Sequence, residues 1–162
     1  AAYVSSSRED ESPLARLFSF FSSYTAPTWY AVNRTQLLKR SFEEIYANGT
    51  PLEDYVSYEM LISGVPLLFG KLKRLEGFYQ ARRFIPAPPD KYVVYAKYLL
   101  DESFSERYNK IKQSLIRALP DSETYDPQKV ADAIDFSFAA YYGQRISTKE
   151  MQAHMQTLNL NE

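Results

Sequence analysis

Carboxylate pairs and a single histidine are the side chains of this chain that could carry out proton-transfer chemistry. Glu150 and His154 lie four positions apart on a predicted helix, where they could share a proton or form half of a metal site. The closest carboxylate pairs are Glu43 with Glu44, Asp101 with Glu102, and Asp132 with Asp135. No apolar, Gly-rich sequence surrounds these pairs to raise a pKa or seat a substrate. We interpret them as solvated helix faces and predict no catalytic residue and no enzyme activity.

The Cys and His content limits metal and redox chemistry further. The chain of 162 residues has no Cys and one His, which excludes disulfides, thiolate nucleophiles, iron–sulfur clusters and zinc sites built on several His. Residues 64–71 resemble a phosphate-binding loop, but five residues separate Gly64 from Gly70 where that loop has four. Leu72 also stands where the loop needs Ser or Thr. We therefore predict no cofactor and no metal.

A basic stretch is the strongest candidate for binding a macromolecule. Its five cations precede Phe84 and an aromatic cluster; they are Lys71, Lys73, Arg74, Arg82 and Arg83. Basic residues interleaved with aromatic ones bind single-stranded nucleic acid through phosphate pairing and base stacking. The same residue types anchor protein interfaces. A solvated helix face whose aromatic side chains belong to the core explains the pattern equally well.

Net charge favours a protein partner over nucleic acid. The formal net charge is −1 and the pI is near 6.0, whereas dedicated nucleic-acid binders usually carry a strong positive field. RNA binding is therefore disfavoured. By residue type alone, the predicted partner-interface anchors are Trp29, Arg82, Arg83 and Phe84.

The elements that must position these residues are predicted to be helices. The chain is 45% apolar and has 5 Gly, a composition that favours helices over a turn-rich sheet. Apolar side chains recur at helical spacing within residues 14–21, 37–45, 68–79, 95–99, 108–119, 130–138 and 149–158. Breakers are predicted at residues 26–28, 48–51, 64–66, 85–90, 119–121 and 143–144.

Helix starts are also marked in the sequence. Ser12 and Asp126 each precede a Pro at a first helical position, and Ser103 with Glu106 has the spacing of a capping box. Ser147 with Glu150 repeats that spacing. We predict an all-α chain of about seven or eight short helices, stacked in helical hairpins as an α-solenoid.

The predicted domain organisation is simple. A single helical-repeat domain over residues 13–158 follows a flexible N-terminal tail, residues 1–12, and precedes a C-terminal tail, residues 159–162. The chain begins with Ala1 and lacks an initiator Met, so we expect either trimming or the removal of a leader. The longest apolar runs are far shorter than the roughly 20 residues of a membrane-spanning helix, so no direct membrane insertion is predicted.

Internal similarity indicates repeats. One shift of the chain places Tyr55 on Tyr92, Val56 on Val93, Tyr58 on Tyr95 and Ile62 on Leu99. Asp-bearing links at Asp54, Asp90 and Asp126 would begin successive units, although chance matching among Tyr-rich helices is the alternative. The run from Asp54 to Gly64 resembles the start of a pentatricopeptide repeat, in which Asp precedes a short helix carrying Tyr, then Leu-Ile, a small residue and Gly. Tetratricopeptide-like repeats have similar periods, so the sequence does not distinguish them from pentatricopeptide repeats.

The resemblance implies stacked helical hairpins in a mitochondrial or plastid protein, and most members of that family bind single-stranded RNA. In RNA-reading members the residue after the helix Tyr is usually Asn, Ser or Thr, because a short polar side chain meets a base edge. The corresponding residues here are Glu59 and Ala96, so the scaffold is implied without the RNA code.

Taken whole, the chain resembles the family of small helical subunits of euglenozoan mitochondrial F-type ATP synthases. This resemblance implies a non-catalytic structural subunit in a hetero-oligomeric complex, on the matrix side of the inner membrane. Its partner would be the outer face of the α subunit in the catalytic head, whose assembly or stability it would support. The alternatives are an organellar RNA-binding or ribosome-associated repeat protein, and an adaptor that grips extended peptides.

Overall fold

A computed structural model gives the fold and describes residues 6–25, 28, 31–51, 54–75 and 98–146. Within these residues the helices are α1 (Pro13–Phe21), α2 (Thr35–Ala47), α3 (Tyr55–Phe69), α5 (Phe104–Ala118), the short 3-10 helix η3 (Ser122–Thr124) and α6 (Pro127–Ile146). The described residues contain no strand, only an isolated antiparallel bridge between Arg8 and Leu72. The all-α prediction is confirmed.

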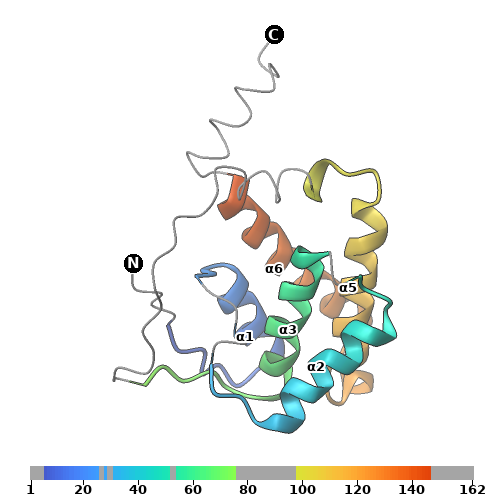
Figure 1. Cartoon of the computed structure of the whole chain (residues 1–162). Coiled ribbons are helices and arrows are strands. Elements are labelled where there is room, and N and C mark those ends of the chain that lie inside the picture. The colour runs from blue at the N-terminus through green and yellow to red at the C-terminus, as the bar shows by residue number, and fades with distance from the viewer. Residues whose placement is uncertain (1–5, 26–27, 29–30, 52–53, 76–97, 147–162) are drawn as a thin grey trace.

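Helix α3 lies at the centre of the described helices and packs against α1, α2 and α5 (Figure 1). Helix α6 packs against both α1 and α5, so the first and last described helices are in contact. Every residue of α3 from Val56 to Leu68 except Tyr58 is buried. A helix that is apolar on all sides is stable only when neighbours surround it, and α3 has them.

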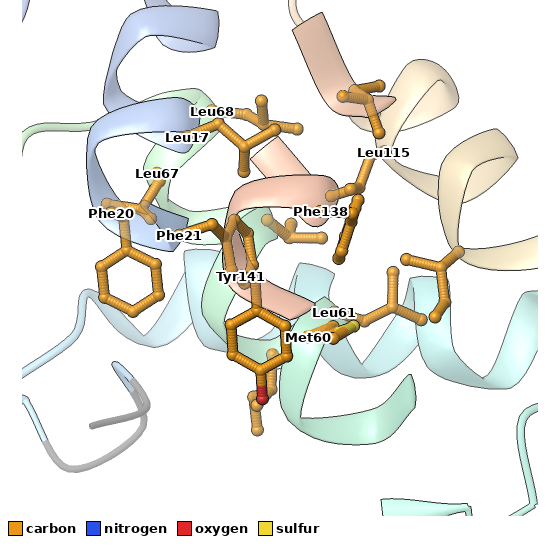
Figure 2. Close-up of a cluster of buried hydrophobic side chains, with 14 of the residues drawn as sticks. Leu17, Phe20, Phe21, Met60, Leu61, Leu67, Leu68, Leu115, Phe138 and Tyr141 are labelled. Carbon is orange, nitrogen blue, oxygen red and sulfur yellow. The ribbon is translucent and has the colours of Figure 1, made fainter. Parts of the chain in front are cut away.

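The core forms where α1, α3, α5 and α6 meet. Phe21 of α1 contacts Phe138 and Tyr141 of α6, with ring centroids 5.1 Å and 5.7 Å apart. Such tilted and edge-on aromatic pairs add to the stabilisation from buried area. Figure 2 shows the labelled core side chains, which are Leu17, Phe20, Phe21, Met60, Leu61, Leu67, Leu68, Leu115, Phe138 and Tyr141.

The predicted break at residues 64–66 is wrong, because α3 continues through Gly64 and Pro66. A Cβ at Gly64 would lie 3.1 Å from Leu115 Cδ2 and 3.4 Å from Leu17 Cδ1. Glycine therefore allows the close packing of α1, α3 and α5 at this point and does not end the helix.

Pro66 is tolerated inside α3 because another segment replaces the hydrogen bond that it removes. Proline has no N–H to donate to the carbonyl four residues earlier, which belongs to Ile62. The buried Thr28 hydroxyl lies 3.3 Å from that carbonyl oxygen and 3.4 Å from the carbonyl oxygen of Ser63. The Thr28 N–H also donates to the Ser63 hydroxyl at 3.3 Å. Thr28 thus fastens the segment after α1 to the weakest turn of α3.

Arg16 caps the C-terminal end of α3 from inside the protein. Its side chain is buried, and Nε donates to the Leu67 carbonyl at 2.8 Å while Nη2 donates to the Leu68 carbonyl at 3.2 Å. Nη1 donates to the carbonyls of Asp10 and Glu11 at 2.8 Å and 2.7 Å. The last carbonyls of a helix lack intrahelical partners and carry partial negative charge, so a buried guanidinium is well placed there.

The helix predicted over residues 68–79 is wrong within the described part of that range. Helix α3 ends at Phe69, and Gly70 is extended. The backbones of Leu72 and Arg8 exchange two hydrogen bonds, of 2.7 Å and 2.9 Å. The Arg74 N–H donates to the Ser7 hydroxyl at 2.9 Å. Ser7 and Arg8, which belong to the predicted N-terminal tail of residues 1–12, therefore bond the segment that follows α3.

Most predicted helix ends agree with the structure. Ser12 accepts the Ala15 N–H at 3.4 Å, and the Asp54 and Asp126 carboxylates accept the N–H groups of Ser57 and Gln128 at 3.1 Å and 2.9 Å. Helices α2 and α5 end at the predicted breakers near residues 48 and 119.

Two predicted helix-end features are wrong. The Ser103 side chain does not cap α5. Its hydroxyl and its backbone N–H both donate to the Asp101 carboxylate, so the predicted capping box with Glu106 does not form. Helix α6 runs through the predicted breaker at Gly143, which is exposed and meets no neighbouring side chain that a Cβ would disturb.

The finer architecture stays a prediction. Consecutive helices α2 and α3 pack together, as do α5 and α6. Residues 76–97 lie outside the described residues, so the total number of helices and the stacked-hairpin order are not tested. The domain limits at residues 13 and 158 and the tail over 159–162 likewise stay predictions.

Candidate interaction site

The predicted partner anchors all lie outside the described residues. Trp29, Arg82, Arg83 and Phe84 fall in segments that the structure does not describe, and so do Glu150 and His154. The assignments of these residues stay predictions.

The described part of the basic stretch lies on the surface. Lys71, Lys73 and Arg74 are exposed, and Lys71 Nζ lies 2.5 Å from the Glu11 carboxylate. That ion pair lowers the pKa of Glu11, first through the hydrogen bond from Lys71 and then through its charge. A surface ion pair of this kind is worth little in stability. The segment presents these cations to solvent.

Glu59, at the position where RNA-reading repeats carry a short polar side chain, lies inside the protein. Its side chain is 4% exposed, and the Tyr24 hydroxyl donates to its carboxylate. A residue in this environment joins α3 to the end of α1 and cannot present its side chain to a base. Ala96, the second such position, lies outside the described residues.

The carboxylate pairs singled out in the sequence have structural partners. Glu44 accepts from Arg117 at 2.6 Å and 3.0 Å, which links α2 to α5. Asp101 accepts two hydrogen bonds from Ser103, and these lower its pKa. The other contacts are Glu43 with Lys39 at 3.9 Å and Asp132 with Gln128 at 2.7 Å.

A shallow, open cleft of about 420 Å³ lies between α5 and α6. Four of its lining residues are aromatic, and they form one pair on each helix whose members are one helical turn apart. The lining residues are Phe104, Tyr108, Asn109, Lys112, Asp135, Phe138, Ala139 and Tyr142. An aromatic wall with a few polar groups is the usual character of a binding cleft.

The polar groups of the cleft form one cluster around Asp135. Lys112 Nζ lies 2.6 Å from one Asp135 carboxylate oxygen, and the Tyr108 hydroxyl donates to the other. Burial alone would raise the pKa of Asp135, but the hydrogen bonds from Lys112 and Tyr108 lower it below its ordinary value. Burial and then the bond to Asp135 raise the pKa of the Tyr108 phenol. The cluster therefore keeps an ionised carboxylate and a neutral phenol at neutral pH.

Helix α6 also carries exposed apolar surface next to the lining residues in sequence. The Phe136 side chain is 68% exposed and lies one turn of α6 before Ala139, itself an exposed lining residue. Exposed aromatic side chains beside a cleft are typical of protein interfaces.

This cleft was not predicted from the sequence, which singled out Asp135 only as one member of a carboxylate pair. The signal that could have found it is the aromatic spacing of residues 104 with 108 and 138 with 142.

No known protein family, curated protein or solved structure matches the chain. Among the described residues, no group of three or more His, Cys, Asp or Glu is placed to hold a metal ion. In the same residues, no helix combines the length and apolar character needed to span a bilayer.

Proposed function

We propose that this protein is a non-catalytic structural subunit of a mitochondrial complex and that it binds protein through the cleft between α5 and α6. The aromatic cleft, together with the exposed Phe136 next to its lining residue Asp135, is the observation that carries this proposal. Aromatic pockets at a surface accept anchor side chains from a partner protein. The Lys112–Asp135 pair at the cleft adds one donor and one acceptor that would orient a polar tip.

The chemistry of the buried ionisable groups supports a structural role. Arg16 holds the end of α3, Asp54 caps its start, and Glu59 bonds Tyr24. Each of these groups is committed to joining segments of the fold. Buried charges used in this way specify one arrangement of helices and leave the outer surface to recognise a partner.

The proposed partner is the α subunit in the catalytic head of the mitochondrial F-type ATP synthase. This assignment rests on the resemblance in size, degenerate repeats and missing RNA-code residues. The protein would act on the matrix side of the inner membrane, outside the head, and support its assembly or stability. Its scaffold would be a degenerate α-solenoid. The packed consecutive pairs α2/α3 and α5/α6 and the helix-starting residues Asp54 and Asp126 support this scaffold, whereas the packing of α6 on α1 is not a nearest-neighbour contact of an open solenoid.

A substitution that fills the cleft without touching the core tests the docking surface. Ala139 is exposed and lines the cleft, so Ala139→Arg would place a long side chain across it while keeping a residue that favours helix. Gln113→Arg is the matched control, because Gln113 is an exposed residue of α5 outside the cleft and gains the same charge. Both variants should melt within about 2 °C of the wild type, because substitutions at exposed helix positions change stability little.

The assay is recovery of the ATP synthase α subunit on the tagged, full chain in mitochondria. We expect wild type and Gln113→Arg to recover it equally and Ala139→Arg to lose at least tenfold. Equal recovery with all three would show that the partner is right and the cleft is not its docking surface. No recovery with the wild type would remove the proposed partner.

RNA binding is the second candidate, favoured by the exposed Lys71, Lys73 and Arg74. In that case the chain would recover ribosomal or RNA-processing proteins that vanish on nuclease treatment. RNA affinity would also fall steeply with salt, because phosphate contacts release counterions.

A further inference from the structure

A buried guanidinium near the end of α1 has an unused hydrogen-bond donor. Arg8 is 7% exposed, and its Nη1 donates to the Ser7 carbonyl at 3.0 Å. Its Nη2 donates to the hydroxyl of Ser23. The adjacent Nε–H is buried and has no hydrogen-bond partner among the residues that the structure describes. In a guanidinium, Nε and Nη2 are neighbouring donors in a fixed plane, so the Arg8 group has one donor on Ser23 and a second beside it with nothing to bond.

The charge of Arg8 is also incompletely balanced. Within the described residues no carboxylate comes within ion-pair distance of it, and Asp10 acts only through its longer-range charge. The Asp10 carboxylate instead accepts from the Ser19 hydroxyl at 3.1 Å. A buried cation with an unsatisfied N–H is costly unless an anion reaches it.

Ser23 is placed where such an anion could be attached. It is exposed, lies just beyond the last residue of α1, and donates its hydroxyl to the Ser19 carbonyl at 3.0 Å. The hydroxyl oxygen itself faces Arg8. If the Ser23 hydroxyl oxygen carried a phosphate, the phosphate oxygens would lie next to Nη2 and Nε of Arg8, which are the occupied and the free donor of the guanidinium. Fork-like pairing of Arg with a phosphate is among the strongest hydrogen-bond arrangements in proteins.

We propose that Ser23 is a phosphorylation site and that Arg8 is the residue that receives its phosphate. A protein kinase would transfer the γ-phosphoryl group of ATP: the Ser23 Oγ–phosphorus bond forms, the bond from phosphorus to the ADP oxygen breaks, and the hydroxyl proton goes to the kinase base. The product carries a phosphate whose oxygens accept from Nε and Nη2 of Arg8.

The consequence is a tighter attachment of residues 6–12. Arg8 also pairs through its backbone with Leu72, so a phosphate on Ser23 would join the end of α1, the N-terminal segment and the segment after α3 at one point. The opposing effect is repulsion from Asp10, which the pairing with Arg8 must exceed. The modification would therefore stabilise the folded chain and slow the opening of residues 6–12.

The test uses the full chain with phosphoserine incorporated at position 23, in the Arg8 and Arg8→Gln backgrounds. We expect the phosphate to raise the melting temperature by roughly 3 °C in the chain with Arg8. In the Arg8→Gln chain the phosphate should leave the melting temperature unchanged or lower it. A rise of the same size in both backgrounds, or no rise with Arg8, would overturn the assignment of Arg8.

Phosphorus NMR gives a second readout that does not depend on the folding of the Arg8→Gln variant. Pairing with a guanidinium favours the dianion, so the second phosphate pKa in the folded chain should lie below that of a phosphopeptide spanning residues 17–34. Equal pKa values would contradict the pairing. Fragment mass spectra of the chain isolated with phosphatase inhibitors should place phosphate on Ser23. Recovery of that peptide only in its unmodified form would reject the modification.

Discussion

Replacing Arg16 by Met should destabilise the protein by about 3 kcal/mol, because two buried carbonyls would lose their partners. Arg16 donates to the Leu67 and Leu68 carbonyls, and both residues are buried at the end of α3. The carbonyls of Asp10 and Glu11 belong to exposed residues, so water can replace the guanidinium there. Each buried carbonyl left without a donor costs about 1–3 kcal/mol, and relief from burying the charge offsets part of the sum.

Chemical and thermal unfolding followed by circular dichroism measure this effect. A loss of about 3 kcal/mol corresponds to a fall in melting temperature of about 9 °C for a chain of this size. Arg16→Lys should lose about half as much, since one ammonium cannot span both pairs of carbonyls. Lys110→Met is the control, because Lys110 pairs with Glu106 at the surface and should lose less than about 1 kcal/mol. An Arg16→Met variant that loses no more than the control would refute the capping role.

Three further changes test other parts of the account. Thr28→Val should cost about 1–2 kcal/mol in unfolding free energy, because the Ile62 carbonyl opposite Pro66 loses its donor. Asp121 has a positive φ of 50°, so Asp121→Gly should leave stability unchanged or raise it, whereas Asp121→Val should lower it by about 1–2 kcal/mol. Because contacts with Lys112 depress the folded pKa of Asp135, its stabilisation is complete above the unfolded pKa of about 4 and is lost as the pH falls below it. The stability difference between wild type and Asp135→Asn, measured by urea unfolding, should therefore shrink from pH 7 to pH 2.5, and a difference that stays constant would contradict the pairing.

Helix starts could be predicted because a cap needs only residues close in sequence. Ser12, Asp54 and Asp126 each cap the helix that follows, as their positions before a helical pattern indicate. Ser103 shows the limit of this reasoning, because the nearby Asp101 competes successfully for its N–H and hydroxyl.

The course of α3 could not be predicted, because its exceptions depend on residues far away in sequence. Gly64 and Pro66 are helix breakers in isolation. In the fold, Thr28 supplies the donor that Pro66 removes, and the contact with Leu115 uses the missing Cβ of Gly64. Tertiary contacts outweigh local propensity at both positions.

The cleft between α5 and α6 likewise depends on contacts between residues far apart in sequence. The types of Tyr108 and Asp135 are visible in the sequence, but their meeting requires α5 to lie against α6 at one register. Aromatic residues at one-turn spacing also fit a buried helix face, so the pattern alone does not distinguish a cleft from a core. The predicted anchors Trp29, Arg82, Arg83 and Phe84 lie outside the described residues and stay predictions.

The central claim, a structural subunit of the ATP synthase head, is tested most directly by purifying the tagged protein from native mitochondria at near-physiological salt. Quantitative mass spectrometry with and without nuclease would give its stoichiometry to each partner. We expect a fixed ratio to the α and β subunits that nuclease does not change. Recovery with ribosomal or RNA-processing proteins, lost on nuclease treatment, would contradict it.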